Sequence, residues 1–322
     1  MKEYGVNSHF NEAKTHYPVM KDDILEILKD KCANQSPHKY FNMLDCTIGT
    51  GGHALHFLKN LGNLKISGLD SDERMIEYLE KTVSQQSDES IKPRIEYRCG
   101  NFKDIPRNLS TFKFADYNKK EEIQYDFVFA DLGYNSIQLE NPDYGLKYSD
   151  NGNLDMRYSM DNTLTAKQML NELDLNRLEG IFRDYGQENR ATEIAKAIVE
   201  RRKKKPFETN KDLLELLDSF KSKTKSPKTP KRIFQSLRIA VNSELSSLDS
   251  LLSSLPSILK PNGFAFFLVF HSLEKEKVQN AVLIPNIKVI HFSKPSAKEC
   301  QENSRSKSAS LVVFRKKKGI FE

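Results

Sequence analysis

Residues 41–70 read as a strand, a glycine-rich turn, a helix and a second strand that ends on an acid. An apolar run at 41–46 precedes the glycines, and a second apolar run stops at Asp70. This is the layout of the first βαβ unit of a nucleotide-binding sheet. Glycine lets the backbone approach a ligand at the helix N-terminus, and the acid can accept hydrogen bonds from a ribose diol. The stretch therefore predicts a nucleotide-type site at the carboxyl edge of a parallel sheet.

The segments on either side extend this pattern into an α/β fold. Apolar strands alternate with helical stretches, which predicts a parallel, doubly wound sheet. The further strands are expected at 94–98, 125–131, 264–270, 287–292 and 309–314.

Between residues 140 and 232 no strand is expected, and the chain reads as helices. Helical stretches are predicted at 166–173, 191–202 and 213–220, followed by a Ser/Pro/Lys-rich linker at 219–232. A single long helix is then predicted from its apolar stripe, which runs from Phe234 to Leu252. We therefore divide the chain into a first sheet segment at 1–139, a helical insertion at 140–232 that recognises substrate, and a second sheet segment at 233–322.

Composition narrows the class of protein. The chain has 322 residues, 38% of them hydrophobic and 29% charged, which is typical of a globular protein. No run is long enough to cross a membrane, and the first residues lack the apolar core of a signal peptide. The four cysteines form no CxxC pair, so neither a metal site nor a disulfide framework is expected. These features favour a cytoplasmic protein without membrane contact.

The net charge of +6 is unevenly distributed. Basic runs lie at 201–205 and 315–318, and residues 221–232 contain no acid. Such runs fit either a solvated surface or contact with a polyanion such as nucleic acid.

Ligands of open α/β sheets collect where the strands end. Asp70 suits a ribose, Phe102 can pack on a purine, and Asp131 lies where reacting atoms are expected. The turn Gly49-Thr-Gly-Gly-His-Ala54 also satisfies the dinucleotide-binding pattern G-x-G-x-x-A. On this motif alone, a dinucleotide-dependent oxidoreductase remains an alternative.

Longer motifs resemble the MraW (RsmH) family of methyltransferases. Two of them follow the Asp131 strand, a third lies on the predicted long helix, and others lie near both ends of the chain. They are His16-Tyr-Pro-Val19, Asp45 to His53, Asp131-Leu-Gly-Tyr-Asn-Ser-Ile-Gln138-Leu, Leu154-Asp-Met-Arg157, Tyr185-Gly-Gln-Glu188, Phe234 to Leu245, Phe270-His-Ser-Leu-Glu274 and Asn303-Ser-Arg-Ser-Lys-Ser308. Together they cover nearly the whole chain in the family's order.

This resemblance implies a class I (Rossmann-like) methyltransferase sheet with an inserted all-helical domain. It also implies transfer of a methyl group from S-adenosyl-L-methionine to the N4 amine of a cytosine in small-subunit ribosomal RNA, near the decoding centre. The partner would be ribosomal RNA within the small ribosomal subunit. The cofactor-binding residues carried over are Gly51, Gly52, His53, Asp70, Phe102, Asp131 and Gln138.

Some positions depart from the family pattern. The family's DLGxSS appears as Asp131-Leu-Gly-Tyr134-Asn135-Ser136, and its Asp-Arg after the His-Ser-Leu-Glu motif is replaced by Lys275-Glu276. The departures keep two alternatives open: a methyltransferase of the same fold with another substrate, and a non-catalytic ribosome-assembly factor. A homodimer is also left open, although no heptad pattern supports one.

For the chemistry, the cytosine amine must be held in line with the methyl group while acceptors orient its N–H groups. Asp131 is the candidate acceptor, Asn135 is a weaker second one, and Tyr134 is a candidate for stacking on the base. His271 is expected to be structural. Arg157 and Arg238 are expected either to bind phosphate or to form internal ion pairs.

Overall fold

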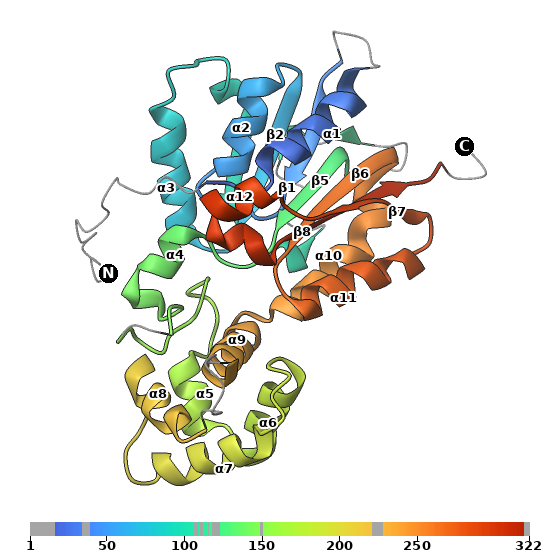
Figure 1. Ribbon diagram of the computed structural model, residues 1–322. Helices are drawn as coiled ribbons and strands as arrows, with labels where there is room; N and C mark the ends of the chain where they lie inside the picture. The colour runs from blue at the N-terminus through green and yellow to red at the C-terminus, as the bar shows by residue number, and fades with distance from the viewer. Residues whose placement is uncertain are drawn as a thin grey trace.

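The computed structural model describes residues 17–33, 39–105, 109, 112–114, 116–117, 123–148, 151–220 and 228–318. Its centre is one twisted sheet with the strand order β3-β2-β1-β5-β6-β8-β7 (Figure 1). The strands are β1 (Phe41–Asp45), β2 (Leu64–Asp70), β3 (Ile95–Cys99), β5 (Ile123–Asp131), β6 (Leu259–Val269), β7 (Ile287–Ser293) and β8 (Ser310–Lys316), and the short β4 (Asp116–Tyr117) pairs with β5. All the strands expected from the sequence are present.

The sheet is doubly wound, and the strand order reverses between β1 and β5. Strands β3, β2, β1, β5 and β6 are parallel, but β8 lies antiparallel between β6 and β7. The expectation of a wholly parallel sheet is therefore wrong for this strand. The chain returns from β7 through α12 (Ala297–Glu302) and the short helix η6 (Ser304–Ser308) at the same edge of the sheet, so β8 enters in the reverse direction.

Two layers of helices bury the faces of the sheet. On one face the core packs beneath α1 (Lys21–Ala33), α2 (Gly52–Asn60) and α3 (Glu73–Ser84). On the other it packs beneath α10 (Glu244–Ile258) and α11 (Ser272–Asn280). The apolar strand residues alternate between these two clusters, as when Phe266 faces the first and Phe267 the second.

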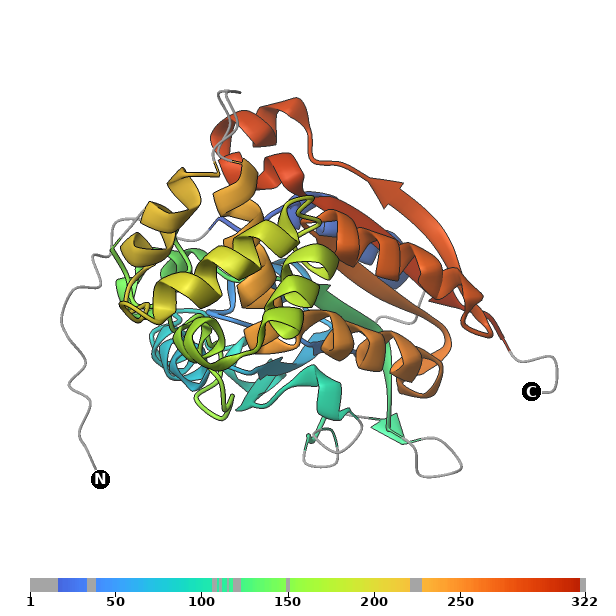
Figure 2. The same cartoon turned by 90° about the horizontal axis from the view of Figure 1, so that it is seen from below.

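A third apolar cluster lies in a group of helices at one end of the sheet (Figures 1 and 2). The helices are α5 (Ala166–Glu172), α6 (Leu175–Asp184), α7 (Ala191–Arg202), α8 (Asn210–Asp218) and α9 (Lys228–Asn242), with α4 (Ser136–Glu140) on the path from β5. The predicted helices at 166–173, 191–202 and 213–220 are confirmed, but α6 was missed. The side chains of Thr209 and Asp212 form the expected capping box at the start of α8.

The predicted long helix is two helices. Ser243 has a left-handed backbone (φ 50°) and separates α9 from α10. The stripe is divided accordingly, because Leu237 packs in the third cluster whereas Leu248 packs against the sheet. Residues 228–232, expected in a linker, belong to α9, and 221–227 lie outside the described residues.

Candidate active site

A cavity of about 380 Å³ opens where β1, β2 and β5 end, at the point where the strand order reverses. Acids stand at all three strand ends: Asp45, Asp70 and Asp131. The opposite wall comes from α9 and the segment before α5, so the cavity lies between the sheet and the helical group. Every predicted site residue except Gly51 lines it, namely Gly52, His53, Asp70, Phe102, Asp131, Tyr134, Asn135 and Gln138.

The Asp70 carboxylate is oriented by the backbone around it. Its Oδ2 accepts a hydrogen bond from the Gly49 amide (2.9 Å), and its Oδ1 accepts one from the Asp72 amide (2.9 Å). The carboxylate therefore joins the glycine-rich turn to the start of α3. Each oxygen has further lone pairs with which to accept hydrogen bonds from a bound ligand.

The glycine-rich turn needs its glycines for different reasons. Gly51 has a φ of 85°, and a Cβ there would come within 2.5 Å of Leu79 Cδ1. It is thus required by the turn and by packing against α3. Gly52 lines the cavity at the first position of α2, whose N-cap supplies no capping side chain. The amide groups at this helix end suit an anionic part of a ligand.

His53 connects the cavity to the start of the chain. Its Nε2 lies 2.9 Å from the Val19 carbonyl oxygen, to which it must donate because a carbonyl only accepts. Its Nδ1 lies 3.5 Å from Asp131 Oδ2. The Asp131 amide in turn donates to the Thr47 hydroxyl (2.7 Å). Asp131 is therefore held against the glycine-rich turn and has limited solvent contact.

Asn135 and Gln138 form a reciprocal capping box at the start of α4. The Asn135 Oδ1 accepts from the Gln138 amide (2.9 Å), so the oxygen expected to receive a substrate N–H already has a partner. The Gln138 side chain donates to buried Asp72 (2.9 Å), which also accepts from the Tyr144 hydroxyl. The contacts of Gln138 thus connect the start of α3 with the helical group.

Arg305 also lines the cavity, although the sequence did not single it out as a site residue. Its guanidinium, on η6, donates to the Tyr134 carbonyl (2.9 Å) and to the Ser136 hydroxyl. Its Cζ lies 5.4 Å from the centre of the Tyr134 ring, and that of Arg238 lies 5.0 Å from it. The Tyr134 ring therefore lies close to two cations. The Asn-Ser-Arg motif was the available signal, but nothing in its spacing shows that it reaches this wall.

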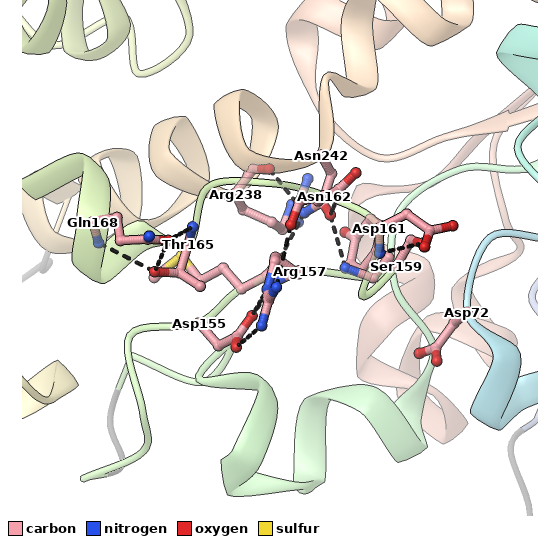
Figure 3. Close-up of polar contacts among 12 residues, drawn as sticks. Asp72, Asp155, Arg157, Ser159, Asp161, Asn162, Thr165, Gln168, Arg238 and Asn242 are labelled. Atoms are coloured by element: carbon pink, nitrogen blue, oxygen red, sulfur yellow. Dashed lines mark hydrogen bonds and ion pairs between the residues drawn. The ribbon is translucent and has the colours of Figure 1, made fainter. Parts of the chain in front are cut away.

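Arg157 and Arg238 form internal ion pairs. Arg157 pairs with Asp155 (2.8 Å), and Arg238 pairs through two nitrogens with Glu244 (2.8 and 2.9 Å). Figure 3 shows how the segment carrying Arg157 is tied to α9, because Asn242 accepts from the Asn162 side chain (3.1 Å). Asn242 also donates to the Met156 carbonyl (2.7 Å). These contacts fix the wall of the cavity that faces the sheet.

Glu244, His271 and Glu274 offer ligand atoms within 4.8 Å of one another on the cavity wall. Both oxygens of Glu244 are paired with Arg238, whose charge opposes a metal ion there. Glu274 accepts from the backbone amides of Phe270 (2.7 Å) and His271 (3.2 Å). The cluster is thus explained by the capping of α11 and by ion pairing, which agrees with a structural role for His271.

The three acids share one electrostatic environment. Burial raises the pKa of Asp131 to about 7, with Arg305 opposing the shift and Glu274 adding to it. Burial likewise raises the pKa of Asp70 to about 7 and that of Asp45 to about 8, against hydrogen bonds from nearby amides. A cation that enters this cavity would be attracted by the carboxylates. Its charge would in turn lower their pKa values and favour the ionised form.

The cofactor-free protein is expected to lose thermal stability as the pH rises from about 6 to about 8. The three acids keep protons in the folded state that they have already lost in the unfolded chain, so the stabilisation is complete below about pH 4 and disappears through pH 7 to 8. The readout is the melting temperature across this range. Asp45→Asn, which keeps an oxygen for the Thr47 amide, should flatten the decline. An equally steep decline in that variant would contradict the role of Asp45.

The strand order with β8 reversed, and the acid of β2 beside a glycine-rich turn, define a class I S-adenosylmethionine-dependent methyltransferase. In the described residues no helix is long and apolar enough to span a bilayer.

The chain belongs to the MraW methylase family, whose sequence profile matches residues 13–317. "Ribosomal RNA small subunit methyltransferase H" of Dictyoglomus turgidum is 34% identical over 305 residues, covering 92% of this chain and 96% of that protein. The protein of the same name from Crocosphaera subtropica is 32% identical, covering 95% and 91%. Among solved structures, TrmN from Thermus thermophilus is 13% identical with a TM-score of 0.40, covering 91% of this chain and 48% of that one. The family assignment depends on the sequence matches.

Proposed function

We propose that this chain transfers the methyl group of S-adenosyl-L-methionine to the N4 amine of a cytosine in small-subunit ribosomal RNA, in the cytoplasm. The observation that carries the proposal is the match to small-subunit rRNA methyltransferases over nearly the full length of both chains. The N4 position and a target near the decoding centre are what the resemblance to the family implies.

The cavity fits the methyl donor. Its volume of about 380 Å³ lies within the range of small-molecule sites. Asp70 would hold the ribose, Phe102 would pack on the adenine, and Gly52 and His53 would face the methionine part. Gln138 would support donor binding indirectly, through the hydrogen bond that it donates to Asp72. Gly51 would do so by allowing the backbone conformation of the turn. The bound donor would supply a methyl group attached to a positively charged sulfonium sulfur, and the three acids favour that charge.

The chain's own residues would orient the acceptor. The cytosine amine is a poor nucleophile because its lone pair is delocalised into the ring, so position matters more than a strong base. Asp131 would accept one amine N–H and fix the direction of the lone pair. Tyr134 would stack on the base, and Asn135 would support the loop that carries Tyr134 by capping α4.

We divide the chain into sheet segments 1–139 and 233–322 and a helical segment 140–232 between them. The helical segment would recognise the RNA. The third apolar cluster supports a separately packed unit, and its inclusion of Ile233, Leu237 and Val241 extends that unit into α9. Lys231 on α9 lines the cavity and adds positive charge on the RNA side.

The test is mass spectrometry of ribosomal RNA nucleosides from cells lacking this protein. We expect one N4-methylated cytosine to be absent, and purified protein with S-adenosylmethionine to restore it on isolated small subunits. An unchanged nucleoside profile would refute the proposal.

A further inference from the structure

A second hollow, of about 200 Å³, lies beside the active-site cavity. Phe270, His271 and Ser308 line both, so the two share a wall. The second hollow is distinguished by three lysines, which come from separate elements: Lys275 from α11, Lys294 from the segment after β7, and Lys307 from η6.

Among the described residues, no acid compensates the charge in this hollow. Its lining contains three serines besides the three lysines, and no acid. Within the described part of the chain the three ammonium groups form no ion pair, whereas Lys277 on the same α11 pairs with Asp249 at 2.6 Å. Like charges that line one small hollow repel one another. An anion placed among them would relieve that repulsion.

An exposed aromatic ring lies next to one of these lysines. The Lys275 ammonium lies 4.9 Å from the centre of the Phe292 ring, and Phe292 is 43% exposed. Proteins that bind single-stranded nucleic acid commonly combine a cationic groove with exposed aromatic side chains. The positive charge holds the phosphates, and the ring stacks on a base.

We propose that this hollow binds a phosphodiester of the RNA strand next to the target nucleotide, with Phe292 stacking on a neighbouring base. The inference rests on the proposed function for the identity of the RNA. Lys275-Glu276 stands where the family pattern has Asp-Arg, so the cation lies one position earlier in this chain. The site would position the strand and leave the methyl donor untouched.

The test compares the wild-type protein with the triple variant Lys275→Ala/Lys294→Ala/Lys307→Ala. Binding of a single-stranded RNA oligonucleotide is measured by fluorescence anisotropy at several salt concentrations, and the KM for unmethylated small subunits is measured separately. We expect RNA affinity to fall about tenfold or more, and the log–log salt dependence to become shallower by about 0.7 for each phosphate that the variant no longer neutralises. Affinity for S-adenosylhomocysteine should not change, which also shows that the variant is folded.

The matched control is Lys29→Ala/Lys59→Ala/Lys81→Ala, which removes the same charge from exposed positions on α1, α2 and α3. Replacing the three hollow lysines with arginine should preserve binding. Equal affinity and slope in the hollow variant and the control would overturn the inference. Oligonucleotide binding is measured without methyl transfer, so it tests the hollow alone. A failure of the proposed function would instead appear as absent methyl transfer by the wild-type protein.

Discussion

Replacing Asp131 with asparagine is expected to reduce kcat for methyl transfer by about 100- to 1,000-fold at saturating methyl donor. Asparagine keeps the size of the side chain but removes the negative charge and presents an N–H donor where an acceptor is needed. The Thr47 contact to the backbone of residue 131 does not depend on the side chain, so the end of β5 should stay in place. Single-turnover kinetics on isolated small subunits measure this step.

Asp126→Asn is the matched control, because Asp126 lies on the same strand away from the cavity. It accepts from the Asn42 amide (3.0 Å) and from Lys260 (2.6 Å), so its loss should lower stability and leave kcat unchanged. If Asp131 only bound the donor, Asp131→Asn would raise the donor's Kd while kcat at saturation stayed near the wild-type value. That result would remove Asp131 from the chemistry.

The rate should also depend on pH in a defined direction. Because burial raises the pKa of Asp131 to about 7, the free enzyme holds this side chain largely neutral in mild acid. The carboxylate form is the better acceptor, so kcat/KM should rise through about pH 7 and then level off. In Asp131→Asn the rise should be smaller, and the part that remains would come from Asp70, whose pKa is also raised to about 7.

The sequence was most informative where local patterns act alone. The run at 41–70 predicted the β1–α2–β2 unit because a continuous apolar run gives way, after the glycines, to apolar residues at helical spacing. The strand-end residues Asp70, Phe102 and Asp131 reached one cavity because parallel strands end at a common edge. Both inferences needed only short-range regularities.

Long-range contacts were beyond such reasoning. The apolar stripe of 234–252 continues across Ser243 without a break, and only packing against two different clusters divides it into α9 and α10. The reversal of β8 follows from the path of the chain after β7, and apolar strand composition does not encode direction. Arg305 likewise reaches the Tyr134 loop from 171 residues away.

Replacing Asp70 with asparagine is expected to weaken binding of S-adenosylmethionine and S-adenosylhomocysteine by about 100-fold. The loss of charge-assisted hydrogen bonds to a ribose diol is worth about 3 kcal/mol, and about 1.4 kcal/mol corresponds to a factor of ten. Isothermal titration calorimetry measures the Kd, and kcat at saturating donor should stay within a few fold of the wild-type value.

The stability of the unliganded variant separates this binding role from a structural one. Burial raises the pKa of Asp70 to about 7, so above that pH the cofactor-free protein holds a buried charge that costs folding free energy. Asparagine removes the charge and keeps one oxygen for the Gly49 or Asp72 amide. Removal of the buried charge should offset the loss of the other amide hydrogen bond. The melting temperature of unliganded Asp70→Asn at about pH 8 should therefore stay close to that of the wild type, although its ligand binds more weakly. A lower melting temperature together with unchanged ligand affinity would mean that Asp70 serves the turn and not the ligand.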